Sequence, residues 1–316
     1  MRGKTSWMMA AALTVGGTAG AAAADLAAPK VMPAPVAVAA STPIDFIFGA
    51  RLASDYIFRG ISQSNRRPSV QSYGEVQLFD NFFYAGFATY RVDLPTKPQQ
   101  EVDLTIGIRP KFGQFTFDFG LIYYYYPGER RFLNPYSPVT YDTFFFGTFD
   151  GPGILTPRNT DFLEFAGKVT WTPSDQWTIG GGVFHAYDWL GTGAPATYIN
   201  GTAKYALPEG LVGPGVLAFS GEIGYYDLGK TSPQLGSIKL ADYTTWNIGA
   251  SYTYKQVTLD LRYHDTNLGK RDCFLNTTDP RGVFNGGRSN WCSETFVATL
   301  SVDLVASQLG IFAPAK

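Results

Sequence analysis

The side chains that could do chemistry are acids and bases that recur at every second position within short segments of the chain. In residues 101–109, Asp103 and Arg109 lie at odd-numbered positions, whereas Val102, Leu104 and Ile106 lie at even-numbered positions. We call each such set of alternate positions a parity. Period-two alternation places the two sets on opposite faces of a β-strand. Mixed charges on one such face form salt bridges or, around a water-filled lumen, set ion preference. The candidates that share the polar parity are Arg51, Glu75, Asp103, Arg109, Asp118, Glu164, Lys168, Lys204, Glu222, Asp260, Arg262 and His264.

Catalysis is the competing use of such residues. A hydrolase of the serine type needs a serine beside an activating histidine, and the chain has only two histidines. His185 falls on the apolar parity of its segment without a serine on the same face, and His264 falls beside Asp260 and Arg262. We therefore predict that the protein is not an enzyme and needs no cofactor.

Composition restricts the class of protein. Charged residues make up 16% of the chain, against about 25% in an average soluble domain. Aromatic residues make up another 16%, and the net charge is −1, so no overall basic field indicates nucleic-acid binding. Beyond the N-terminus no apolar run approaches the roughly 18 residues of a transmembrane helix. These features favour an all-β protein with an unusually large apolar surface.

The ends of the chain predict export. Residues 1–24 combine Arg2 and Lys4, a short apolar stretch and a small-residue cleavage site, which is typical of a signal peptide. Residues 25–43 are rich in Ala and Pro and predict a flexible segment. In an oxidising compartment Cys273 and Cys292 can form a disulfide. A zinc site is the alternative, although the sequence lacks CxxC or HxxxH spacing.

Twelve segments of eight to thirteen residues carry the alternating pattern. Their connections alternate between tight turns, such as Asp80-Asn81 and Lys255-Gln256, and longer loops, such as 126–160 and 265–293. Short turns at one end and long loops at the other are typical of an outer-membrane barrel. The sequence thus predicts a transmembrane antiparallel up-and-down β-barrel over residues 44–304, with short periplasmic turns, long extracellular loops and a C-terminal extension, 305–316.

Aromatic side chains at the strand ends predict two interfacial girdles. On the turn side we place Trp171 and Trp177. In residues 82–93 we place Tyr84, Tyr90 and Val92 on the lipid-facing parity. The girdle on the loop side is expected to comprise Tyr90, Tyr123, Tyr125, Tyr187, Trp189, Tyr225 and Tyr263.

Several motifs resemble those of a known family. Residues 53–64 read ASDYIFRGISQS and are followed by Pro68-Ser69-Val70-Gln71. Looser matches are Glu101-Val102-Asp103, the run 123–128, and Tyr263-His264-Asp265-Thr266 leading to Cys273. Over roughly 44–304 the chain resembles the TorF-like porin family of proteobacteria. The resemblance implies an outer-membrane barrel that acts as a porin.

The functional prediction is a passive porin with a narrow, charged lumen for ions and small hydrophilic solutes in the outer membrane of a Gram-negative bacterium. Outer-membrane lipid and the barrel-assembly machinery are the expected partners, nucleic acid is not, and monomer and homo-oligomer stay open. A plugged lumen stays open as well, because twelve strands lie between filled barrels and wide channels. The alternative function is a non-conducting barrel that acts through its loops as an adhesin, receptor or anchor.

Overall fold

The computed structural model describes residues 44–129 and 159–309. The expected signal peptide (1–24), the Ala/Pro-rich segment (25–43) and the last part of the C-terminal extension (310–316) lie outside the described residues. So does most of the longest loop, 130–158.

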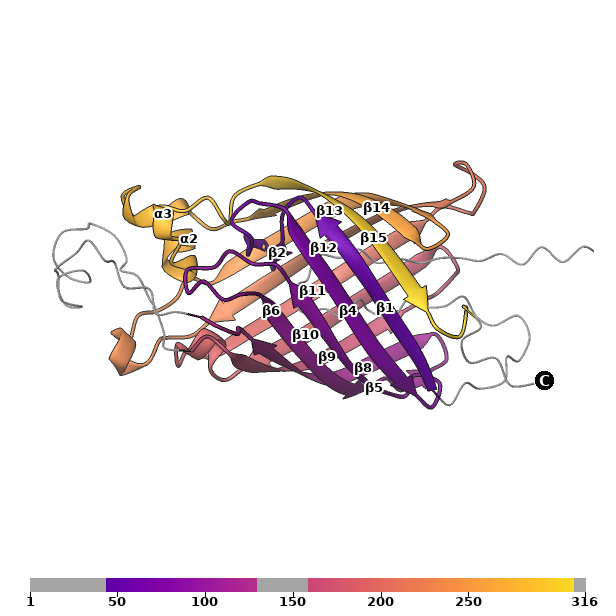
Figure 1. The fold of residues 1–316 in the computed structure, drawn as a ribbon, viewed down its shortest axis with the longest axis horizontal. Coiled ribbons are helices and arrows are strands. Elements are labelled where there is room, and N and C mark those ends of the chain that lie inside the picture. Colours follow the sequence, from indigo (N-terminus) through magenta and orange to yellow (C-terminus); the bar gives the residue numbers. More distant parts are fainter. Residues whose placement is uncertain (1–43, 130–158, 310–316) are drawn as a thin grey trace, which may run out of the picture.

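Within the described residues, twelve long antiparallel strands form one closed sheet (Figure 1). Each pairs with its neighbours along the chain; β1 pairs with β15, and β6 pairs with β8, to complete the barrel. The long strands are β1 (Ile44–Ala53), β4 (Ser69–Leu78), β5 (Phe83–Tyr90), β6 (Glu101–Ile108), β8 (Phe115–Tyr125), β9 (Phe162–Trp171), β10 (Trp177–Ala186), β11 (Ala196–Ala206), β12 (Val216–Leu228), β13 (Tyr243–Tyr254), β14 (Val257–Thr266) and β15 (Thr295–Val305).

The predicted barrel class, strand number and alternation of connections are confirmed. Each expected segment agrees with its strand to within three residues at either end. A two-residue strand, β7 (Lys111–Phe112), pairs only with β8 and continues the line of β6 beyond a break at Arg109 and Pro110. Proline lacks the backbone N–H that an uninterrupted ladder would use, which accounts for the break.

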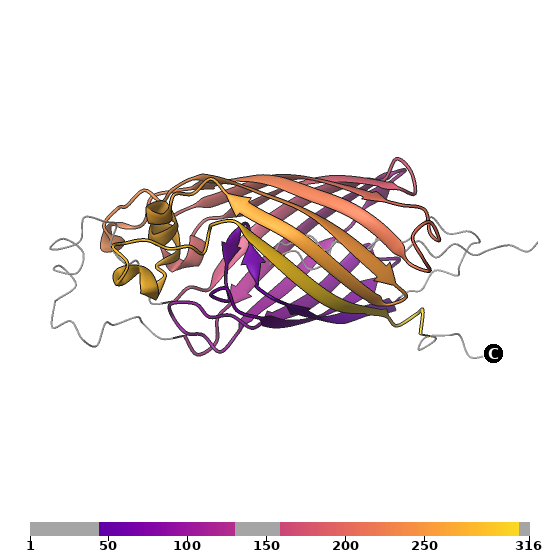
Figure 2. The same cartoon turned by 90° about the horizontal axis from the view of Figure 1, so that it is seen from above.

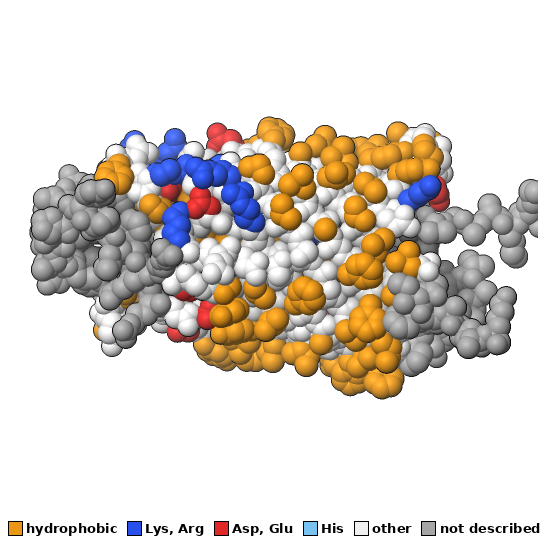
Figure 3. All heavy atoms as spheres, in the orientation of Figure 1, with side chains coloured by type: hydrophobic (Ala, Val, Ile, Leu, Met, Phe, Trp, Pro, Cys, Tyr) orange, Lys and Arg blue, Asp and Glu red, His pale blue; other side chains and the backbone are white. Residues whose placement is uncertain are grey.

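The two faces of the barrel wall differ in the way that the alternation predicts. Large apolar side chains such as Val70, Ile106 and Leu261 are 57–60% exposed on the outer face. On the face shown in Figure 3 they form a broad apolar band, whereas Lys and Arg side chains gather at the loop end. A closed barrel leaves no backbone edge unpaired in lipid. The outer face is therefore the membrane-spanning surface of an outer-membrane barrel.

Three aromatic residues do not face lipid as expected. Tyr84 and Tyr90 point inwards and are each 6% exposed, while Phe83 and Phe87 occupy the outer parity of β5. Glycine makes room for Tyr84, since Cβ atoms on Gly107 or Gly120 would lie 2.5 Å from its hydroxyl. Apolar side chains thus occur on both faces of β5, so alternation alone does not show which face of this strand points towards lipid.

Trp189 is the third aromatic residue that does not face lipid. It begins the short 3-10 helix η1 (Trp189–Gly191) in the loop after β10, is 7% exposed and packs among the buried aromatics. Tyr123, Tyr125, Tyr187 and Tyr225 are exposed, as the girdle requires.

The loop end also carries a second 3-10 helix, η2 (Pro233–Leu235), and two short helices, α2 (Lys270–Thr277) and α3 (Pro280–Val283). In residues 44–129 and 159–309, no helix has the length and apolar character needed to cross a membrane.

A charge placed on the outer face tests the orientation of the wall. Leu261 lies at the centre of β14, whereas Leu211 lies in the turn after β11; both are exposed. Leu261→Arg is expected to lower the free energy of unfolding by about 2–4 kcal/mol and Leu211→Arg by about 0–1 kcal/mol, because the cost of arginine depends on depth in the bilayer. Denaturant titration in lipid vesicles measures both. Equal losses would contradict the assigned lipid face.

Candidate functional site

The connection between β1 and β4 folds back into the barrel (Figure 2). Within it, β2 (Ile57–Phe58) pairs with β3 (Ile61–Ser62) across Arg59 and Gly60, and we call residues 54–68 the inner hairpin. The two turn residues have φ angles of +46° and +83°, as a type I′ turn requires. A Cβ atom on Gly60 would overlap the side chains of Thr245 on β13 and Thr266 on β14. The tip of the inner hairpin is thus packed against the barrel wall.

Arg59, at the tip of the inner hairpin, forms a buried ion pair with Glu164 of β9. Nη1 donates to Oε1 at 2.8 Å and Nη2 to Oε2 at 2.7 Å, and neither side chain is more than 2% exposed. Bidentate pairing of this kind is strong and geometrically specific. The guanidinium carbon also lies 4.5–5.0 Å from the ring centres of Phe58, Phe184, Tyr198 and Tyr226. Because β10 and β11 stand across the barrel from β1, Arg59 carries the hairpin across the lumen.

Tyrosines fill the space on the other side of the hairpin. Tyr56 donates its hydroxyl hydrogen to Glu101 of β6 at 2.5 Å and stacks on Tyr90 at 4.7 Å. The hydroxyl of Tyr243 donates to the backbone oxygen of Arg59 at 3.0 Å. The half of the lumen nearest the loops is therefore largely filled by packed aromatic side chains.

An acidic residue links the two arms of the inner hairpin through side-chain hydrogen bonds. Asp55 accepts hydrogen bonds from the hydroxyls of Ser62 and Ser64 at 2.7 and 2.8 Å. Burial raises the pKa of the Asp55 carboxyl above its usual value, and the two serines and the charge of Arg66 offset only part of that effect. Arg66 lies 3.5 Å from the carboxylate.

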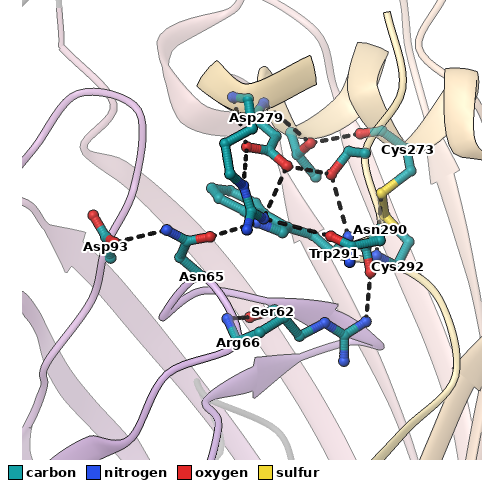
Figure 4. Close-up of polar contacts among 12 residues, drawn as sticks. Ser62, Asn65, Arg66, Asp93, Cys273, Asp279, Asn290, Trp291 and Cys292 are labelled. Carbon is teal, nitrogen blue, oxygen red and sulfur yellow. Dashed lines mark hydrogen bonds and ion pairs between the residues drawn. A yellow bond between two sulfur atoms is a disulfide. The ribbon is translucent and has the colours of Figure 1, made fainter. Parts of the chain in front are cut away.

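The disulfide-bonded loop holds the inner hairpin from above (Figure 4). Cys273 and Cys292 form the predicted disulfide. Next to it, the backbone oxygen of Trp291 accepts from the N–H of Ser62 at 2.9 Å, and the indole N–H of Trp291 donates to Asn65 at 3.2 Å. The disulfide thus fixes the loop that contacts the hairpin at two points.

Two further side chains of the inner hairpin, Arg66 and Asn65, form hydrogen bonds to neighbouring loops (Figure 4). Arg66 donates to the backbone oxygens of Asn290 and Ser293 at 2.6 and 2.7 Å. Asn65 donates to Asp93 in the loop after β5 at 2.8 Å. Burial alone would raise the pKa of Asp93, but hydrogen bonds from Lys97 and Asn65 outweigh it and hold the pKa below its usual value.

Near the turns, the lumen contains a network of paired charges. Arg109 donates to Glu75 at 2.6 and 2.8 Å and to Asp118 at 3.0 Å. Asp118 also accepts from the hydroxyl of Tyr84 at 2.7 Å and lies 3.3 Å from Lys168. The ring of Tyr84 lies 3.6 Å from the guanidinium carbon of Arg109. These charges neutralise one another along the wall formed by β4 to β9.

A second network lies on the wall formed by β12 to β14. Arg262 donates to Asp260 at 2.9 Å, to Asn247 at 2.7 Å and to the hydroxyl of Ser220 at 2.7 Å. Glu222 of β12 accepts from Tyr198 at 2.5 Å and is half-buried.

All twelve charged or titratable candidates from the sequence lie on the inward parity. The structure distributes them over separate groups. One group of paired charges contains Arg109, Glu75, Asp118 and Lys168. Arg262 forms an ion pair with Asp260, and Glu164 forms one with Arg59. His264 and Lys204 are buried, and Arg51 is half-buried with its guanidinium over the Tyr73 ring.

Asp103 stands apart from these networks. It is 1% exposed, and neither carboxylate oxygen has a hydrogen-bond partner among the described residues. Glu101 precedes it on the same face of β6. Asp103 therefore lies in the half of the lumen that aromatic side chains fill, away from the accessible charges.

The alternating pattern did not identify Arg59 and Tyr56 as lumen residues, because both lie between the first two alternating segments and belong to neither. One signal was present. Arg59-Gly60 separates two short segments that each contain isoleucine, Ile57–Phe58 and Ile61–Ser62, and a glycine in such a two-residue connection is typical of a tight hairpin.

The alternative chemistry around His185 can also be placed. Its Nδ1 lies 2.9 Å from the hydroxyl oxygen of Thr197, and its ring contacts Tyr187 at the outer surface of the barrel. Within residues 44–129 and 159–309, no group of three or more His, Cys, Asp or Glu side chains is arranged to hold a metal ion.

Comparisons with known proteins give a family but no described activity. The family model "Bacterial protein of unknown function (Gcw_chp)" matches residues 37–296. That description does not carry the TorF-like name that the motifs suggested. No curated protein matches the chain in sequence.

Three solved structures have a similar chain course at low identity. The KdgM porin has a TM-score of 0.42 at 8% identity, covering 82% of this chain and 97% of its own. An outer-membrane channel from Pseudomonas putida F1 has 0.40 at 10%, covering 85% and 97%. The outer-membrane protein opdK from Pseudomonas aeruginosa has 0.37 at 10%, covering 75% and 58%.

The Arg59–Glu164 pair can be tested by removing one charge. Glu164→Gln leaves the buried guanidinium without its counter-charge, and breaking a buried pair costs about 3–5 kcal/mol. The same substitution at exposed Glu209, in the turn after β11, is expected to change stability by less than about 0.5 kcal/mol. Urea unfolding of both variants in lipid vesicles measures the difference. A loss no larger at Glu164 than at Glu209 would mean that the pair does not hold the hairpin.

Proposed function

The chain belongs to the Gcw_chp family of bacterial proteins of unknown function, and we propose that it is a passive outer-membrane channel for ions and small hydrophilic solutes. The inner hairpin is the constriction of this channel. Solutes diffuse down their own gradients, so the proposed function needs no catalytic group and no cofactor.

The observation that carries this proposal is an accessible strip on the inner wall near the turns. Thr202 of β11 lies on the inward parity and is nevertheless exposed. Around it β9 and β10 present small inward residues that are half-buried, namely Thr170, Thr178, Gly180 and Gly182. Exposed polar groups inside a closed barrel indicate water in this half of the lumen. A water-filled lumen lined by polar groups is the basis of passive diffusion in such barrels.

The proposed selectivity residues are the charges that keep access to this water. Arg51, Lys168 and Glu222 are half-buried and lie on the inward parity. The remaining nine candidates from the sequence are buried, and in this proposal their charges shape the wall and its field rather than touch the solute.

The second candidate function is a non-conducting barrel that acts through its loops as an adhesin, receptor or anchor. The inner hairpin favours it, because Arg59 and the surrounding aromatics fill much of the loop half of the lumen. Conductance of the purified protein separates the two candidates.

The expected biogenesis belongs to the same proposal. Residues 1–24 are removed on export, residues 25–43 precede the barrel as a flexible segment, and residues 305–316 follow it. The barrel-assembly machinery inserts residues 44–304 into the outer membrane, as monomer or homo-oligomer.

Removing the constriction is the direct test of conduction. Replacing residues 57–62 by two glycines deletes the tip of the inner hairpin and is expected to raise single-channel conductance in planar bilayers by about twofold or more, because the lumen widens at its narrowest part. The unaltered protein is expected to give smaller but reproducible steps. Absence of steps from both proteins would eliminate the channel proposal and support the second candidate. Equal conductance would place the constriction elsewhere.

Ion preference tests the accessible charges. In a KCl gradient, Glu222→Gln is expected to move the reversal potential towards anion preference and Lys168→Gln towards cation preference, because each removes one charge beside the water-filled path. The two variants control for each other, since a general disturbance of the lumen would move both in the same direction. A reversal potential unchanged in both would assign selectivity to the loops.

A further inference from the structure

A pocket lies at the loop end of the barrel, next to the inner hairpin. Its volume is about 90 Å³, which corresponds to roughly three water molecules at about 30 Å³ each in the liquid. Its wall is built by Phe58 of the inner hairpin, Trp189 of η1, Tyr243 of β13, Leu275 of α2, and Trp291 of the disulfide-bonded loop. Separate loops thus converge on one concave site, where ligand pockets of barrels commonly occur.

The lining of this pocket is suited to an uncharged ligand. Aromatic rings supply much of its wall, and its polar groups are amides, hydroxyls and the indole N–H groups. None of the described lining residues is charged. A charged ligand would lose its hydration here without gaining a counter-charge. An aromatic ring, by contrast, can stack on the faces and edges of the surrounding rings.

Two polar groups in the wall lack a hydrogen-bond partner among the described residues, the indole N–H of Trp189 and the hydroxyl of Tyr226. Trp189 is 7% exposed, and its indole Nε1–H has no hydrogen-bond partner among the described residues. Its ring packs edge to face against the ring of Tyr226, with a distance of 6.0 Å between the two ring centres. Buried tryptophan N–H groups usually have an acceptor, so an acceptor on a bound molecule would complete this site.

We propose that the pocket binds a small neutral aromatic molecule that carries a hydrogen-bond acceptor. The ring packs among the aromatic side chains, and the acceptor receives the hydrogen of Trp189 Nε1. Binding does not require conduction, so the pocket can be tested independently of the channel proposal.

The test compares two probes of nearly equal shape, neutral benzamide and anionic benzoate, on the mature chain in detergent micelles. Calorimetric titration at neutral pH is expected to give saturable binding of benzamide and at least about tenfold weaker binding of benzoate, a ratio of about 1.4 kcal/mol. Titration of empty micelles corrects for partitioning. No saturable benzamide binding, or equal binding of both probes, would overturn the proposal.

A matched pair of variants locates the site. Trp189→Phe keeps an aromatic ring and removes the donor, whereas Trp177→Phe makes the same change on the outer surface at the turn end, where Trp177 is 45% exposed. Trp189→Phe is expected to weaken benzamide binding by about tenfold, and Trp177→Phe to leave it unchanged. Equal effects would refute binding at this pocket. Should Trp189→Phe not fold, as judged by heat-dependent mobility on gels, the benzamide-to-benzoate ratio of the unaltered chain decides.

Discussion

Closure of the sheet is the constraint on which the rest of the structure depends. In lipid, a backbone N–H or C=O without a partner costs several kcal/mol, so the first and last strands have to pair. The ladder between β1 and β15 runs from Ile47 with Val305 to Ala53 with Thr299. The one between β6 and β8 ends at Ile108 with Phe119, and β7 continues the pairing with β8 beyond Pro110. Once these edges are joined, every strand has one face towards lipid and one towards the lumen.

Closure also creates an interior that the wall alone does not fill. In this protein different side chains occupy the two halves of the lumen. Near the loops, the inner hairpin and its aromatic contacts occupy the space, and the charge of Arg59 is neutralised by Glu164. Near the turns, charges pair along the walls and small residues leave an accessible strip on β9 to β11. A constricted half in series with a water-accessible half is the geometry on which the proposed channel rests.

The loops form a layer of their own above this constriction. The disulfide between Cys273 and Cys292 positions Trp291, whose backbone and indole groups contact the inner hairpin. On the chain-entropy view, a bridge across about 20 residues stabilises the folded loop by about 3 kcal/mol. Since Trp291 also lines the loop-end pocket, the same loop shapes both the constriction and the proposed binding site.

The sequence by itself determined the barrel, its strands and the inward position of residues such as Arg109, Asp118 and Arg262, because alternation of polar and apolar residues is a local property. It misassigned Tyr84 and Tyr90, where both parities are apolar. Glycines on neighbouring strands make room for the Tyr84 ring, and Tyr90 stacks on Tyr56 of the inner hairpin. It did not reveal that Arg59 pairs with Glu164 over a separation of 105 residues, or that Trp189 joins the pocket wall. Those features depend on which strands stand across the lumen from one another, and only the closed tertiary structure sets that arrangement.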